Sequence, residues 1–162
     1  MIAQKGEQNG FYRFLQKKVA SSAPMLTGGA PQFAFSTISR FIIPGSCPNL
    51  NATGFTAFPA LNVETVPGAS NNTQLFSVHG TITERNVSMV YLSGQNIPLT
   101  VPISNINTEG GRTFFFAPFP YDSGFARGLT IGALVSGSMS MFNCSAEVAA
   151  ATIYGPALIE VN

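Results

Sequence analysis

The residues that could support catalysis are few and widely separated. The chain contains a single histidine, His79, which stands between Val78 and Gly80 with no Asp or Cys beside it. A serine hydrolase needs a nucleophile, a histidine and an acid held together, and the Gly-x-Ser-x-Gly motif that presents such a nucleophile does not occur. The seven acidic residues include no close pair in sequence, although pairing in space for glycoside hydrolysis stays open. The sequence therefore predicts no catalytic residue and no enzyme, and we interpret His79 as structural.

Cofactor and metal chemistry has equally little support in the sequence. Cys47 and Cys144 lie nearly one hundred positions apart and form no Cys-x-x-Cys motif, so neither a zinc site nor a dithiol redox site is expected. We interpret them as two free thiols, and a disulfide between them stays open. The Gly-rich stretch at residues 110–112 lacks the Walker pattern and a following helix, so it is better interpreted as a hairpin tip. We expect no cofactor and no bound metal.

The composition points toward assembly. The 162 residues suit one domain, and 45% of them are apolar, whereas only 9% are charged. A typical soluble domain has about 25% charged residues. Sparse charge suits a subunit that buries much of its surface against neighbours, because the cores of interfaces are depleted in charge. No apolar run is long enough to cross a bilayer. We therefore predict self-association into a symmetric oligomer and no membrane span.

The first 22 residues differ from the remainder and form a predicted N-terminal arm or short helix. Four of the eight basic residues lie within the first eighteen positions, although the net charge of the whole chain is only +1. Nucleic acid is therefore an unexpected partner, except through this basic arm. Phe11, Phe14 and Leu15 follow helical spacing. Two interpretations as an ordered segment stay open, a helix or tail packed on its own domain and an arm that reaches a neighbouring subunit; disorder is the third alternative. The candidate assembly contacts of the arm are Phe11, Phe14, Lys17 and Lys18.

Residues 23–162 predict an all-β domain, an antiparallel β-sandwich of the jelly-roll type. Short apolar or alternating runs are separated by Gly, Asn and Pro turns, which is typical of sandwiches and barrels. Pro59, Pro98 and Pro102 would remove hydrogen bonds from a central strand, so we expect them on edges or in breaks. About eight strands are predicted, at residues 33–43, 54–66, 75–83, 87–92, 97–103, 113–117, 129–135 and 147–159.

Three consecutive phenylalanines, Phe114, Phe115 and Phe116, are the strongest local anomaly. Neighbouring side chains in a strand point to opposite faces, so one face of this strand must be apolar without belonging to the core of the domain. A second layer of the same chain, a partner subunit, or a carbohydrate or receptor would cover that face. All three residues are therefore candidate assembly contacts, since an uncovered apolar patch favours aggregation.

Two segments of this chain resemble the major spike proteins of the microviruses, the icosahedral single-stranded DNA phages. These segments are residues 21–26, SSAPML, before the first predicted strand, and residues 128–135, GLTIGALV. The chain length is also similar. The resemblance implies a jelly-roll subunit of the virion that forms pentamers at the fivefold vertices of the capsid. It further implies contacts with other capsid proteins, a part in host attachment through a surface receptor, and no catalysis.

Three functional hypotheses follow from the sequence. The first is a virion vertex or coat protein, anchored by the arm and presenting its strand-connecting loops to the host. The second is an oligomeric sugar- or receptor-binding β-sandwich module, in which Tyr91, Tyr121 or Tyr154 would stack on the ligand. The third is an enzyme on a β scaffold, which would show turnover that depends on His79 or on an acidic residue.

Overall fold

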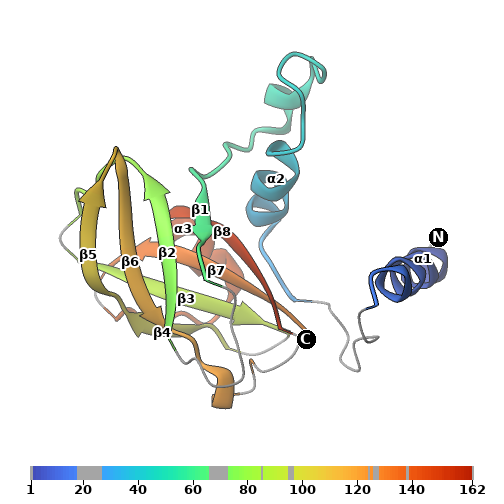
Figure 1. The fold of residues 1–162 in the computed structure, drawn as a ribbon. Helices are drawn as coiled ribbons and strands as arrows, with labels where there is room; N and C mark the ends of the chain where they lie inside the picture. Colours follow the sequence, from blue (N-terminus) through green and yellow to red (C-terminus); the bar gives the residue numbers. More distant parts are fainter. Residues whose placement is uncertain are drawn as a thin grey trace.

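The computed structural model describes residues 2–17, 27–65, 73–84, 86–94, 97–123, 125, 128–137 and 139–161. They form two four-stranded antiparallel sheets packed face to face (Figure 1). The first sheet has the order β1-β2-β6-β5 and the second β4-β3-β7-β8. The strands are β1 (Leu61–Val63), β2 (Thr73–His79), β3 (Val87–Ser93), β4 (Leu99–Pro102), β5 (Ser104–Glu109), β6 (Arg112–Pro118), β7 (Gly128–Ser136) and β8 (Thr152–Val161).

The predicted antiparallel β-sandwich is confirmed, and the order of its strands defines the connectivity. Four pairs of consecutive strands, β1–β2, β3–β4, β5–β6 and β7–β8, are antiparallel neighbours within one sheet, and the β2–β6 and β3–β7 pairs join them. Lettered in chain order as A, B, C, C′, D, E, F and G, the two sheets are ABED and C′CFG. This is the strand order of an immunoglobulin-like sandwich, a fold that many unrelated functions share.

The main core lies between the two sheets. The first sheet contributes Phe76 and Phe115, whose rings stack with centroids 5.7 Å apart, and the second contributes Tyr91. Strands with an apolar face turned inward in this way give the main favourable free energy of a sandwich. The buried residues of this core are Leu61, Phe76, Val78, Met89, Tyr91, Phe115, Ala117, Phe119, Phe125, Leu134, Ala157 and Ile159.

The opposite face of the second sheet carries a second core, which helices cover. Helix α2 (Pro31–Ser39) and helix α3 (Ser145–Ala151) place Phe33, Val148 and Ala149 against the outward-facing residues of β3 and β7. β3 and β7 are therefore buried on both faces, which explains their nearly continuous apolar sequence. This second core contains Ala30, Phe33, Val90, Leu92, Ile131, Ala133, Val135, Phe142, Val148 and Ala149.

The strand predicted at residues 33–43 is wrong, because these residues begin with helix α2. Pro31 occupies the first turn, where a missing N–H costs nothing. Three hydroxyl groups then donate to the carbonyl four residues earlier, so side chains that favour strands or turns are satisfied within a helix. The burial of Phe33 against the second sheet supplies the tertiary contact that overrides strand propensity.

Two further corrections concern the remaining strands. The predicted strand at 147–159 starts as helix α3, whose first turn is closed by Glu147 accepting a hydrogen bond of 2.7 Å from the Asn143 backbone N–H. The alanine run favours helix there, and β8 follows it. No strand was predicted at β5, which is exposed at every position and polar except for Ile106. The prolines meet expectation: Pro59 and Pro98 precede strands, and Pro102 ends the edge strand β4.

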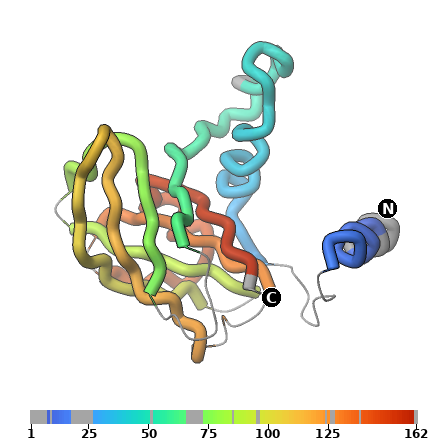
Figure 2. The backbone as a smooth tube through the Cα atoms, viewed as in Figure 1, coloured from blue at the N-terminus to red at the C-terminus, as the bar shows by residue number. Residues whose placement is uncertain are grey.

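Two segments stand off the sandwich. Helix α1 (Ile2–Leu15) confirms helical structure within the predicted arm, and it lies to one side of the sandwich. Residues 18–22 of that arm lie outside the described residues. Helix α2 and the chain that returns from it, including the short 3-10 helix η1 (Leu50–Thr53), project from the sandwich (Figure 2). A second 3-10 helix, η2 (Tyr121–Ser123), follows β6.

Candidate assembly surfaces

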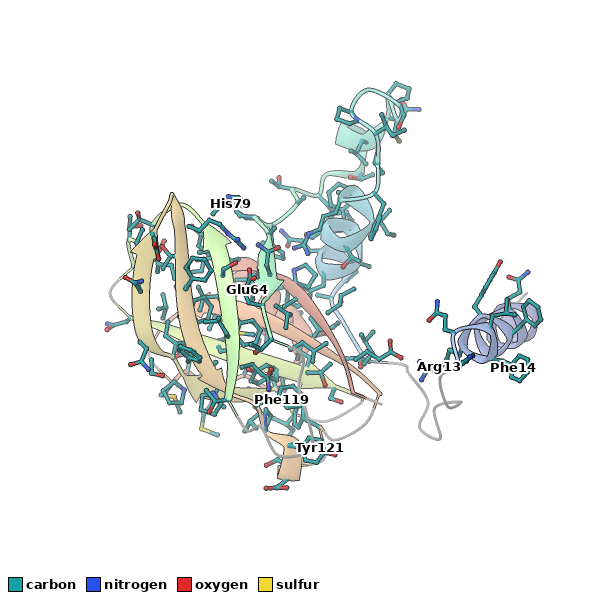
Figure 3. The ribbon with its side chains drawn as sticks, in the orientation of Figure 1. Arg13, Phe14, Glu64, His79, Phe119 and Tyr121 are labelled. Carbon is teal, nitrogen blue, oxygen red and sulfur yellow. The ribbon has the colours of Figure 1, made fainter. Side chains whose placement is uncertain are left out.

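Helix α1 presents large apolar side chains that its own chain leaves uncovered. Phe11, Tyr12, Phe14 and Leu15 are exposed, with Phe14 reaching 76%. Figure 3 shows Phe14 on the side of the helix away from the sandwich. Lys17 is also exposed at the end of the helix, and Lys18 lies outside the described residues. The three described arm contacts predicted from the sequence are thus all accessible, which is what docking to another surface requires.

One ion pair fastens α1 to the sandwich. Arg13 donates to the carboxylate of Glu160 in β8, and the Arg13 side chain is only 9% exposed. Arg13 therefore faces the domain while its neighbours Tyr12 and Phe14 face solvent (Figure 3). This geometry is compatible with a helix packed on its own domain, because Arg13 makes a contact within the chain. It is also compatible with an arm that reaches a neighbouring subunit, because the apolar face of α1 is exposed.

The projection around α2 is a second apolar surface, which the sequence did not identify. Ile38, Phe41, Ile43 and Phe55 are exposed there, and Phe41 reaches 83%. The returning chain is held against the helix by the backbone N–H of Phe58, which donates to the Ser36 hydroxyl at 3.0 Å. Two ring pairs add to this contact, Phe33 with Phe58 at 5.6 Å and Phe35 with Phe55 at 5.7 Å. The projection is therefore an ordered element with an apolar tip.

The anchor of this projection lies on the last strand. The guanidinium of Arg40, just after α2, donates to the Gly155 carbonyl at 2.8 Å. Partial burial lowers the pKa of Arg40. A cation bonded to a backbone carbonyl in this position fixes the direction in which the projection leaves the sandwich.

The three phenylalanines of β6 divide between the two faces of the first sheet, as the strand geometry predicts. Phe115 lies in the main core, and Phe114 and Phe116 are half-buried on the outer face. The guanidinium of Arg112 lies over the Phe114 ring, 5.2 Å from its centroid. The chain thus covers part of this apolar face with a cation, in a contact that typically contributes about 0.5–1 kcal/mol at exposed sites.

A polar cluster next to Phe114 completes the outer face. The carboxylate of Glu64 accepts hydrogen bonds of 2.5 Å from both the Ser77 hydroxyl and the Arg112 guanidinium. The hydrogen bond from Ser77, followed by the charge and hydrogen bond of Arg112, holds the pKa of Glu64 below its ordinary value despite some desolvation. The cluster lies among β1, β2 and β6 (Figure 3) and fixes the alignment of these strands.

The remaining chemical groups stand apart from one another. His79 is exposed at the end of β2, where it pairs in register with Arg112. Cys47 and Cys144 are both free and exposed. Gly110 and Gly111 have φ values of 58° and 76° and form the turn between β5 and β6, which confirms the predicted hairpin tip.

Within the part of the chain that the structure describes, no three His, Cys, Asp or Glu side chains gather closely enough to hold a metal ion. None of the described helices combines the length and apolar character needed to span a membrane.

Comparisons of the chain with protein-family models, with curated proteins and with solved structures found no match. The exposed surfaces and their chemistry are therefore the basis for a functional proposal.

Proposed function

We propose that this chain is a non-enzymatic structural subunit that assembles through its N-terminal arm, and that the assembly is a capsid vertex or spike of a virion. A single observation carries the proposal. The described residues include thirteen exposed large apolar side chains, and eight of these lie on α1 or on the projection between Ile38 and Phe55. Apolar groups gathered on elements that stand off a well-packed sandwich are typical of surfaces that other proteins cover.

The physical cost of these surfaces supports association. Each fully buried large apolar side chain contributes about 1.5–3 kcal/mol relative to the exposed state. With only 9% charged residues, the chain has few charges with which to keep such patches hydrated and apart. A neighbouring subunit that covers these apolar side chains would remove them from water, and charged residues would no longer be needed to keep them hydrated.

The more specific features of the proposal come from the resemblance to microvirus spike proteins. They are a pentamer at a capsid vertex, contact with the coat shell, and host-facing loops that meet a surface receptor. Of the two segments that carry the resemblance, residues 128–135 belong to β7, which is buried on both faces and would be apolar in many sandwiches. The exposed surfaces therefore carry more of the argument than the resemblance does.

The test is the solution mass of the purified chain by light scattering. We expect a discrete oligomer, with a pentamer matching the vertex proposal. A full-length variant with Phe11→Ser, Phe14→Ser and Leu15→Ser should shift toward monomer, as should a chain lacking residues 1–22. The matched control is Ile97→Ser, an exposed apolar residue next to β4 and away from both projecting segments.

Circular dichroism would establish that each variant keeps the sandwich. A monomer for the unmodified chain at concentrations up to the millimolar range would overturn the proposal. An oligomer that persists in the triple variant would reject the arm as its basis.

A sugar- or receptor-binding module is the second candidate, and the outer face of the first sheet favours it. This face combines the half-buried rings of Phe114 and Phe116 with hydrogen-bonding groups of Arg112 and Glu64. Of the tyrosines first considered, Tyr91 is wrong for this role, because its ring is fully buried in the main core. Saturable binding of a glycan or a cell-surface protein that Phe116→Ala abolishes, by a chain that stays monomeric, would favour this module.

A further inference from the structure

A concave pocket lies where the end of α2 meets one edge of each sheet. Helix α2 stands next to the edge strands β1 and β8, and the pocket opens between these three elements (Figure 1). Its volume is about 340 Å³, near the lower end of the volumes of ligand sites. We call it the Arg40 pocket. The segment that ends α2 contributes Arg40 and Phe41, β1 contributes Leu61 and Val63, and β8 contributes Leu158.

The walls of the Arg40 pocket are mainly apolar. Phe41 and Leu158 are 83% and 45% exposed, so they offer uncovered apolar surface at this pocket. Val63 adds a half-buried side chain, and Thr37 and Asn62 add two uncharged polar ones. Sites for small molecules are typically concave and apolar, with a small number of polar groups that fix the orientation of the ligand. The Arg40 pocket has this composition.

Arg40 is the one charged residue among those that line the pocket, and no acid neutralises it in the described part of the chain. The two ion pairs found there use the other described arginines, with Arg13 bound to Glu160 and Arg112 bound to Glu64. Burial lowers the pKa of Arg40, and no acidic group opposes this effect. A partly desolvated cation without a counter-ion favours the binding of an anion, which stabilises its charged form.

The guanidinium of Arg40 is already oriented. It donates one hydrogen bond of 2.8 Å to the Gly155 carbonyl of β8. A guanidinium has five N–H donors in a planar fork, so this bond leaves others for a ligand. Two parallel N–H donors match the two oxygens of a carboxylate, and such charge-assisted pairs are among the strong hydrogen bonds of proteins. The arginine is therefore suited to a bidentate contact with a carboxylate.

We propose that the Arg40 pocket binds a small organic acid, with its carboxylate on the guanidinium of Arg40 and its apolar body against Phe41, Val63 and Leu158. An inorganic anion would match the cation and leave the apolar walls unused. A neutral apolar compound would match the walls and leave the cation without a partner. A carboxylate on an apolar body is the class that uses both features. This inference goes beyond the proposed function, which assigns assembly to α1 and gives this pocket no role.

The first test is an NMR titration of the full-length chain with matched probes. Octanoate carries both the carboxylate and the apolar body, octanamide carries the same body without the charge, and acetate carries the charge with almost no body. We expect saturable binding of octanoate with a dissociation constant about tenfold or more below that of octanamide, in the range of a hydrogen bond to a charged group. Acetate and inorganic phosphate should bind more weakly than octanoate by a similar factor.

The second test assigns the binding to this pocket. Arg40→Gln should raise the dissociation constant of octanoate about tenfold or more, and Arg40→Lys, which keeps the charge but loses the fork, should raise it less. Because Arg40→Gln also removes the bond to Gly155, a second comparison keeps that bond. Phe41→Ala removes an apolar wall and should raise the constant about threefold. Ile43→Ala, at an exposed apolar residue of the same projection that does not line the pocket, should leave it unchanged.

Each result decides for or against the pocket. Octanoate that does not saturate the chain, or that binds no better than octanamide, overturns the proposal. Phosphate that binds as tightly as octanoate also overturns it, because the apolar walls then contribute nothing. Octanoate binding that is the same in Arg40→Gln, Phe41→Ala and the unmodified chain places the ligand elsewhere. The mass of the chain in solution tests assembly, and these dissociation constants test the pocket, so either proposal fails without the other.

Discussion

Arg13 in α1 and Glu160 in β8 form an ion pair, although 147 positions separate them in the sequence. The Arg13 side chain is almost buried, whereas Glu160 keeps a third of its side chain exposed. The pair joins the first helix to the last strand, next to the shallow apolar pocket that α2 forms with β7 and β8. Glu160 also pairs in register with Leu129, which lines this pocket.

Removal of this pair should loosen α1. Arg13→Ala leaves Glu160 solvated, so we expect a modest loss of about 1 kcal/mol from the contact between helix and sandwich. Amide hydrogen exchange in α1 should then accelerate by about fivefold, and β7 should keep its protection. Lys17→Ala, at an exposed basic residue two positions beyond the end of the same helix, is the matched control. Equal exchange in the two variants would show that the pair does not hold the helix.

The sequence of α2 fits two periodic patterns, one typical of a strand and one typical of a helix. Phe33, Phe35 and Thr37 alternate like a strand, and their residue types favour strands. The same segment also has apolar or small residues at helical spacing, and this second pattern is the one that the tertiary contacts select. The positions with helical spacing are 30, 33, 34, 37, 38 and 41. Short apolar runs of this kind fit both the helical and the strand period. Here, packing against the second sheet selects the helix.

Phe33 should be among the most important residues for stability outside the main core. Its ring is 1% exposed, contacts Phe58 and closes the second core between α2 and the second sheet. Phe33→Ala should therefore lower the free energy of unfolding by about 3–5 kcal/mol. Phe41→Ala, two residues beyond the end of the same helix and mostly exposed, should change it by about 0.5 kcal/mol or less. Urea denaturation of both variants gives the comparison, and similar midpoints would mean that the helix contributes nothing to the fold.

The carboxylate of Glu64 makes stability depend on pH in a defined direction. Its pKa is lower in the folded chain than in the unfolded chain, where the ordinary value applies. The folded state therefore gains stability above that ordinary value, about 4.3, and loses it as pH falls toward the lowered pKa. The contribution is about 1 kcal/mol or less, because the side chain is 28% exposed.

The measurement is the urea midpoint between pH 3 and 7. Glu64→Gln should flatten the acid side of this profile. Ser77→Ala, which removes the principal hydrogen bond to the carboxylate, should flatten it in part. A profile for Glu64→Gln with the same acid slope as the unmodified chain would assign the pH dependence to other carboxylates.

The candidate surfaces were predictable only where they are local in sequence. The arm follows from clustered basic residues and helical spacing, and the division of Phe114, Phe115 and Phe116 between two faces follows from strand geometry alone. The apolar pocket between α2, β7 and β8 was not predictable, because α2 and these two strands lie about one hundred residues apart in the chain. Strand pairing and helix docking at that separation depend on the whole fold, and no local pattern encodes them.

Tyr91 offers a test of the main core that is independent of assembly. Its ring is fully buried between Phe76, Phe119 and Phe125, and burial raises its pKa far above the ordinary value. The hydroxyl has no hydrogen-bond partner among the described residues. A buried hydroxyl without a partner costs about 1–3 kcal/mol, so Tyr91→Phe should leave the stability unchanged or raise it by about 1 kcal/mol. Tyr91→Leu, which also removes the ring contacts, should lower it. If thermal denaturation showed that Tyr91→Phe lowers the melting temperature as much as Tyr91→Leu does, a cost from an unpartnered hydroxyl would be rejected.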